Sequence, residues 1–301
     1  MKRVLVIINK WWECDPALLA MLNDNARPAS SPWPTGLQPP RPRPVAPPPP
    51  ENPNPQPRAT FGFSKFAAEI WCISDLLEHL PGAQQSSSEQ KAKLLPRIFS
   101  SGAVPDLVIA VGTAGTPYDD VSQNGNTCVG TKVFIHDGHP GGTNPNSNWS
   151  STFDQVIESA LPEDVFHQMV TFDTDLIASR FLAVPANPAS PPKILADFDN
   201  VALGTVNVTD YLEYKNLDPQ TVQKFGSLPR PGRAASIETT HGIIRAQSQS
   251  PFLFVSGITD RLGHFDEEVG SRGNGQNTAA AYNAGVTVIW LLVRLDQFFS
   301  G

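Results

Sequence analysis

The stretch from Ala234 to Leu262, AASIETTHGIIRAQSQSPFLFVSGITDRL, constrains the fold most, because a helix-like segment stands between two strand-like segments. ETTHGIIRAQ has the apolar spacing of a helix, and PFLFVSGIT is a continuous apolar run typical of a strand covered on both faces. Such a β-α-β unit predicts an α/β protein that binds ligands at the carboxyl ends of its parallel strands. Glu238 and Asp260 are expected to project at that edge.

Both carboxylates also have a purely structural interpretation. Glu238 can be a first-turn carboxylate favoured by the helix dipole, and Asp260 can cap the segment that follows the strand. This stretch alone does not separate the structural interpretation from the functional one.

Other segments extend the α/β pattern. Buried strands are predicted at VLVII (4–8), LVIAV (107–111), KVFIH (132–136) and NVALGTVNV (200–208). Helices are predicted at DPALLAML (15–22), with Asp15 as its cap and Pro16 at its first position, at FGFSKFAAEIWCISDLLEHL (61–80) and at TAAAYNAGVTVIWLLV (278–293). We expect one α/β domain over residues 1–301, with three layers and a central mixed sheet.

Residues 27–58 are interpreted as a proline-rich insertion in that domain. From Pro28 to Pro57 there are fourteen prolines in thirty residues, which excludes a helix or an inner strand and favours polyproline II or disorder. PPRPRP (39–44) suits an SH3-like partner, and a solvated insertion without a partner is the alternative.

Composition excludes several kinds of partner. The formal charge is −7 and the 22 Lys and Arg are dispersed, which argues against nucleic acid. The amino-terminal apolar run is too short for a signal peptide, and the terminal run (278–293) is too short to span a membrane, so no membrane partner is expected. Three cysteines without CxxC spacing indicate a reducing compartment, and we expect a cytoplasmic protein.

Two turns add candidate binding residues. WWEC follows the first strand and places Glu13 at the functional edge, beside Trp11 and Trp12, which either contact a flat ligand or cover the core. In LVIAVGTAGTP, a glycine-rich turn would let the amides at Gly112 and Ala114 approach a ligand beside the Thr113 hydroxyl. An ordinary tight turn is the alternative for this second motif.

No metal site is predicted. His136, Asp137 and His139 lie close together, but no fourth ligand is suggested nearby, and a turn with exposed histidines explains them equally well. Tyr211 can stack on a base or pack in the core.

The order of these motifs resembles the nucleoside phosphorylase and nucleosidase superfamily, most closely its methylthioadenosine/S-adenosylhomocysteine nucleosidases. The matching features are VLVIINKWWECD, VIAVGTAG, VGTKVFIHDG, and the pair SIETTHGI and VSGITD, over most of the chain outside 27–60. The family has the three-layer α/β/α fold, needs no cofactor and forms homo-oligomers. The chain departs from its pattern at Ile237, where the family has Met, and at His241, where the family has a small apolar residue.

The resemblance implies roles for individual residues in cleaving a purine nucleoside. Asp260 would protonate the purine N7, Glu238 would accept hydrogen bonds from the ribose hydroxyls, and Glu13, or else Asp15, would activate water. Substrate-binding positions would be Gly112, Thr113, Ala114, Ile237 and, at the base, Tyr211 or Leu212.

Residue types independently suit this chemistry, because breaking the glycosidic bond leaves positive charge on the sugar and negative charge on the base. An ordinary Asp is protonated only about 0.1% of the time at pH 7, so Asp260 is predicted to be buried with a raised pKa.

Water is favoured over phosphate as the nucleophile. The phosphorylases of the family that the chain resembles hold phosphate with arginines in the first turn and before the glycine-rich turn. Here the first turn has no arginine, Ala110 and Val111 stand directly before Gly112, and Glu13 and Asp15 would repel a phosphate dianion. The expected function is therefore purine nucleoside hydrolysis. The alternatives are a phosphate-dependent purine nucleoside phosphorylase and a nucleoside-binding or storage protein without catalysis.

Overall fold

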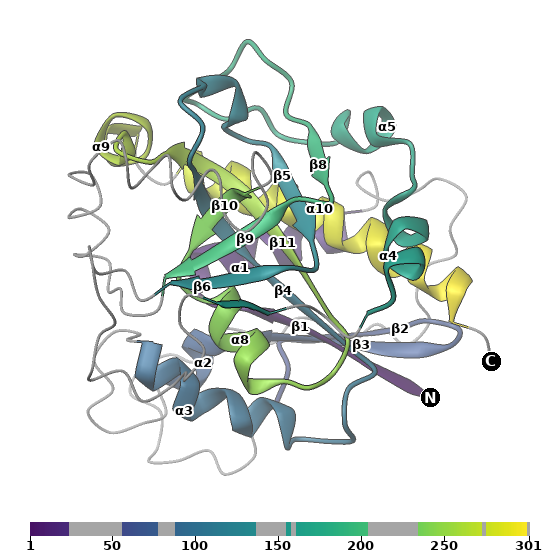
Figure 1. Cartoon of the computed structure of the whole chain (residues 1–301). Helices are drawn as coiled ribbons and strands as arrows, with labels where there is room; N and C mark the ends of the chain where they lie inside the picture. Colours follow the sequence, from purple (N-terminus) through teal and green to yellow (C-terminus); the bar gives the residue numbers. More distant parts are fainter. Residues whose placement is uncertain are drawn as a thin grey trace.

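The computed structural model describes residues 1–23, 56–77, 88–136, 155–157, 161–203, 234–272 and 275–299. They form a central sheet with helices on both faces (Figure 1). The strands are β1 Lys2–Ile8, β2 Ala59–Gly62, β3 Phe66–Cys72, β4 Leu107–Thr116, β5 Thr127–Gly130, β6 Val133–His136, β7 Gln155–Ile157, β8 Ile194–Ala196, β9 Asp199–Leu203, β10 Ala234–Glu238 and β11 Phe252–Arg261. The helices are α1 Trp11–Leu22, α2 Ile73–Leu77, α3 Ser88–Phe99, α4 Glu163–Val170, α5 Thr174–Ala178, α8 His241–Gln247, α9 Phe265–Glu268 and α10 Gly275–Phe298.

The sheet branches at β4. On one side β4 pairs in parallel with β1, which leads to β3 and β2. On the other side it pairs in parallel with β11 and, near its end, antiparallel with β10 through Gly115 and Ile237. One branch continues from β10 to β9, β6 and β7, and the other from β11 to β5 and β8. The segments of the predicted β-α-β unit are present as β10, α8 and β11, but the prediction that its two strands are parallel is wrong. β10 runs antiparallel to β4 and β11 runs parallel to it, so β10 and β11 point in opposite directions with β4 between them.

Two hydrophobic clusters cover the faces of the sheet. In β1 the side chains alternate, with Val4, Val6 and Ile8 in one cluster and Leu5 and Ile7 in the other. The first cluster also contains residues of α1, α4 and α10, and the second contains residues of α2, α3 and α8. Because both faces of the strand are buried, its sequence is continuously apolar. The predicted three-layer fold with a central mixed sheet is confirmed.

The amphipathic helix predicted for residues 61–80 is wrong. The end of β2, all of β3 and the short α2 occupy this segment instead. In β3 every second residue is buried from Phe66 through Ala68 to Ile70, and the strand pairs in parallel with β1. The period of two and the open edge of β1 therefore favour a strand over the helix.

The proline-rich insertion predicted for 27–58 lies almost entirely outside the described residues. Its last residue, Arg58, is buried and is bound into the fold. The Arg58 backbone N–H donates to the Ile70 carbonyl at 2.7 Å, and its guanidinium pairs with Asp75.

The terminal helix α10 packs in the core, as the sequence predicted. Within the described ranges it is the one helix long and apolar enough to cross a bilayer, but 83% of its most apolar window is buried inside the protein. The helix crosses α1 at Gly285, where a Cβ atom would lie 2.3 Å from the Ala17 carbonyl oxygen. Only glycine permits this close approach.

We predict that Gly285→Ala destabilises the protein by about 3 kcal/mol, because the added methyl group forces α1 and α10 apart. Gly275→Ala is the matched control, since its Cβ would meet only the Pro185 ring at 3.4 Å. Urea unfolding of both variants tests the prediction. Equal stabilities for the two variants would contradict it.

Candidate active site

A cavity of about 280 Å³ lies at the carboxyl ends of β1, β4 and β11. Its walls come from the first turn of α1, from β4, from the junction of β10 with α8, and from the end of β11. Predicted site residues that line the cavity are Glu13, Gly112, Thr113, Ala114, Glu238 and Asp260. The cavity therefore brings together three carboxylates that are far apart in the chain.

Glu13 is held rigidly in the first turn of α1. The helix begins at Trp11, not at Asp15 and Pro16 as predicted, because the Glu13 side chain accepts a hydrogen bond from the Lys10 N–H at 2.9 Å and caps the turn. The other Glu13 oxygen accepts from the Thr113 N–H and hydroxyl, each at 2.8 Å. Burial raises the pKa of Glu13, although these hydrogen bonds oppose the rise.

Asp15 does not line the cavity. Its carboxylate is partly exposed and lies 3.5 Å from the Arg58 guanidinium. Of the two acidic residues proposed to activate water, only Glu13 is placed to contact a ligand in the cavity.

Glu238 ends β10 and caps α8. Its carboxylate accepts hydrogen bonds from the backbone N–H groups of Thr240 and His241. Glu238 therefore does stabilise the start of a helix, as its structural interpretation predicted. Its side chain also lines the cavity, as the functional interpretation requires. Burial raises the pKa of Glu238, and the nearby Lys91 ammonium opposes that rise.

Asp260 lies near the end of β11 and is only 1% exposed. The Thr259 hydroxyl donates to Oδ1, whereas Oδ2 is buried and has no hydrogen-bond partner among the described residues. Burial raises the pKa of Asp260 to about 7, and the neighbouring Glu268 charge adds to the rise. A protonated Oδ2 would offer a hydrogen-bond donor to a ligand.

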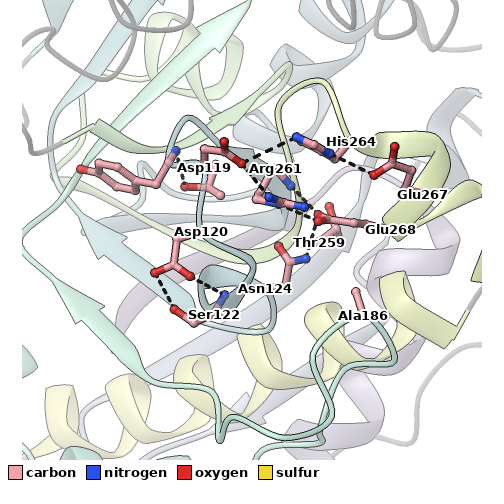
Figure 2. A network of polar contacts seen from close by, with 12 residues as sticks. Asp119, Asp120, Ser122, Asn124, Ala186, Thr259, Arg261, His264, Glu267 and Glu268 are labelled. Carbon is pink, nitrogen blue, oxygen red and sulfur yellow. Dashed lines mark hydrogen bonds and ion pairs between the residues drawn. The ribbon is translucent and has the colours of Figure 1, made fainter.

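An ion-pair network, in which Glu268 is buried and Asp119 is exposed, fixes the end of β11 (Figure 2). Glu268 accepts from the Arg261 backbone N–H at 2.8 Å and from the Arg261 side chain at 2.7 Å. The Asn124 side chain donates to the same carboxylate at 2.8 Å, and Arg261 also pairs with Asp119. The network ties the last residue of α9 to the residue after Asp260, and so helps to hold the strand end that carries that acid.

The glycine-rich turn predicted at 112–115 is not a turn. These residues lie within β4, and Gly112, Thr113 and Ala114 pair with residues 256–258 of β11. The Thr113 amide and hydroxyl both donate to Glu13, so they orient that carboxylate rather than presenting themselves directly to a ligand.

Of the remaining predicted binding residues, the structure describes one. Ile237 is fully buried and is not among the described residues that line it. Tyr211 and Leu212 lie outside the described residues, as do Asp137 and His139. Where the chain is described, no group of three or more His, Cys, Asp or Glu side chains is placed to hold a metal ion.

Most residues of the cavity wall were not predicted as site residues, among them Lys91 and Lys10. Lys91, from α3, donates to the Thr240 hydroxyl at 3.0 Å, and burial lowers its pKa. Lys10 and Trp12 flank Glu13. Lys91 belongs to no recognisable motif, and only the amphipathic pattern of 88–99 would have placed it on a buried helix face. Of the paired tryptophans, Trp12 lines the cavity, whereas Trp11 packs against the core.

Comparisons with known proteins support the fold. The chain matches no protein-family model and no curated protein. The 5′-methylthioadenosine/S-adenosylhomocysteine nucleosidase of S. pneumoniae superposes with a TM-score of 0.56 at 12% identity, over 97% of this chain and 99% of that one. The Colwellia psychrerythraea nucleosidase, solved with adenine, gives 0.53 at 16% identity over 98% and 96% of the chains. Futalosine hydrolase of Helicobacter pylori gives 0.54 at 11% identity over 99% and 98%. The chain therefore has the α/β fold of the nucleoside phosphorylase and nucleosidase superfamily.

The raised pKa of Asp260 makes the stability of the protein depend on pH. Asp260 has a pKa of about 7 in the folded protein, whereas an unfolded Asp ionises near about 3.9. Because the folded pKa is the higher one, ionisation of Asp260 destabilises the fold progressively between these two pH values. Asp260→Asn removes this penalty.

We predict that Asp260→Asn is more stable than the wild type near pH 8, by up to about 4 kcal/mol, and that the difference shrinks as the pH falls toward about 5. Urea unfolding across this pH range measures the difference. A difference that does not change with pH would show that Asp260 has an ordinary pKa.

Proposed function

We propose that the protein is a purine nucleosidase that hydrolyses the bond between the base and the ribose. The observation that carries the proposal is the convergence on one cavity of Glu13, Glu238 and Asp260, each buried and each from a different element of the fold. Solved structures of the same fold include nucleosidases, one of them with adenine bound, and this supports the choice of substrate class.

Asp260 is the acid in this mechanism. As the glycosidic bond breaks, its electron pair moves to the base, and a proton delivered to the purine N7 neutralises the developing charge. A pKa of about 7 keeps much of Asp260 protonated near neutral pH, and Oδ2, which has no partner in the part of the chain that the structure describes, is the oxygen available to the base.

Glu13 is the base that activates water. Its carboxylate is oriented by Thr113 and Lys10, and burial makes it more basic than an exposed glutamate. Glu238 is the carboxylate that accepts from the ribose hydroxyls. Water adds at the sugar carbon and gives its proton to Glu13, so the products are the protonated base and free ribose.

Phosphorolysis is the second candidate, because Lys10 and Lys91 also line the cavity and could attract a phosphate. We favour water, since both lysines already face carboxylates. Lys91 lies in the fields of Glu238 and Glu13, and Lys10 lies in that of Glu13. The cationic charge in the cavity is thus already matched by acidic charge.

Chromatographic detection of free base tests the proposed function. The purified protein is incubated with adenosine, inosine, guanosine, methylthioadenosine or S-adenosylhomocysteine, with and without phosphate. Base release without phosphate is expected. Release only with phosphate would make the protein a phosphorylase, and no release with ligand binding retained would favour a nucleoside-binding protein.

We predict that Asp260→Asn lowers turnover by about 10³-fold and that Glu13→Gln lowers it by about 10²-fold or more, while both variants retain nucleoside binding. Asp15→Asn is the matched control, because Asp15 neighbours Glu13 in sequence but does not line the cavity. Its turnover should stay near that of the wild type. Equal losses in Asp15→Asn and Glu13→Gln would refute the role of Glu13.

A further inference from the structure

His241 has a ring nitrogen that the proposed mechanism leaves unused. The side chain is 1% exposed and lines the cavity, yet its Nε2 atom has no hydrogen-bond partner among the described residues. A buried polar atom without a partner is costly, and a ligand or a water in the cavity would satisfy it.

The other ring nitrogen determines what Nε2 can do. His241 Nδ1 lies 3.4 Å from the Ser256 hydroxyl and 3.7 Å from a carboxylate oxygen of Glu238. The Ser256 hydroxyl oxygen and the Glu238 carboxyl oxygen are both possible acceptors beside Nδ1, which favours the tautomer with its proton there and leaves a lone pair on Nε2. The ring also stacks on Phe254, with centroids 5.7 Å apart, so its orientation is fixed.

Gly112 leaves open the space between His241 and Glu13. A Cβ atom at Gly112 would lie 3.5 Å from His241 Nε2 and 3.2 Å from a Glu13 oxygen. Both acceptors therefore border the same small gap above the backbone of β4. Since Gly112 has no side chain, a water molecule just outside this position can reach both.

We propose that His241 is a second catalytic residue on the nucleophile side, where its Nε2 atom and the Glu13 carboxylate each accept a hydrogen bond from the attacking water. This inference rests on the proposed nucleosidase function. Because the water donates one hydrogen bond to each of the two acceptors, a lone pair on its oxygen points to the sugar carbon.

The proton released when the new carbon–oxygen bond forms goes to Glu13. Burial lowers the pKa of His241 to about 3, so the imidazole is the weaker base and stays neutral. The glycosidic electron pair leaves with the base, which takes its proton from Asp260. One water is consumed and no other reactant is needed.

Substitutions at His241 separate this role from simple packing. Glutamine places a polar atom close to the position of Nε2, asparagine places one only near Nδ1, and phenylalanine keeps the ring and its stacking on Phe254 without either nitrogen. We expect His241→Asn and His241→Phe to lower kcat by about 10²-fold with KM changed less than about 3-fold, and His241→Gln to recover at least about 10-fold of that loss.

The test measures steady-state base release without phosphate for each variant, together with its melting temperature. If His241 has a purely structural role, the activity of the variants follows their stability, and His241→Gln is no more active than His241→Asn. Either result would overturn the inference. The proposed function would still stand as long as the wild type releases the base. A wild type that releases no base would overturn both. Gly112→Ala gives an independent check, since a methyl group in the gap should lower kcat by about 10-fold or more without unfolding the protein.

Discussion

Parallel pairing of β4 with β1 on one side and with β11 on the other is the constraint on which the site depends. It brings the carboxyl ends of three strands to one edge, where the chain leaves the sheet. Glu13 follows β1, Asp260 lies near the end of β11, and Thr113 on β4 lies between them. The antiparallel contact of β10 with the end of β4 adds Glu238. No single segment of the sequence contains this arrangement.

Burying three carboxylates in one cavity is electrostatically costly, and the structure offsets the cost differently for each. Glu13 and Glu238 accept hydrogen bonds from backbone N–H groups, two of them at the start of α8, so their charged forms are partly stabilised. Among the described residues, Asp260 accepts a hydrogen bond only from the Thr259 hydroxyl, and it lies near the charge of Glu268. Burial raises the pKa of all three carboxyl groups, to about 7 for both Glu238 and Asp260, so hydrogen bonding is what distinguishes them. Backbone N–H donors favour the charged forms of Glu13 and Glu238, whereas Asp260 Oδ2 has no partner among the described residues and can carry the proton that glycosidic cleavage needs.

Much of the fold could be predicted from the sequence, because buried parallel strands and a core helix have strong local patterns. Such local patterns are present in the segments that form β1, β4, β11, α8 and α10. Residues 61–80 misled the prediction because FAAEIWC fits both periods, and the pairing partner β1 decides in favour of a strand. The glycine-rich motif was misplaced because pairing with β11 extends β4 through it.

The carboxylates of the site could also be predicted, since each follows or ends a recognisable element. Lys91 could not, because nothing in the local sequence of α3 signals that its side chain enters a cavity formed by distant strands. The unpartnered nitrogen of His241 likewise depends on the spacing between α8 and β4. Such features arise from tertiary contacts, which no local pattern in the sequence reveals.

The protonation state of Asp260 is the most direct test of the account. Infrared difference spectra between the wild type and Asp260→Asn would isolate the carbonyl stretch of a protonated carboxyl group. The account predicts a band that is present near pH 6, shifts in heavy water, and disappears as the pH rises through about 7. A wild type that shows only the carboxylate signal near pH 6 would contradict the assignment of Asp260 as the acid.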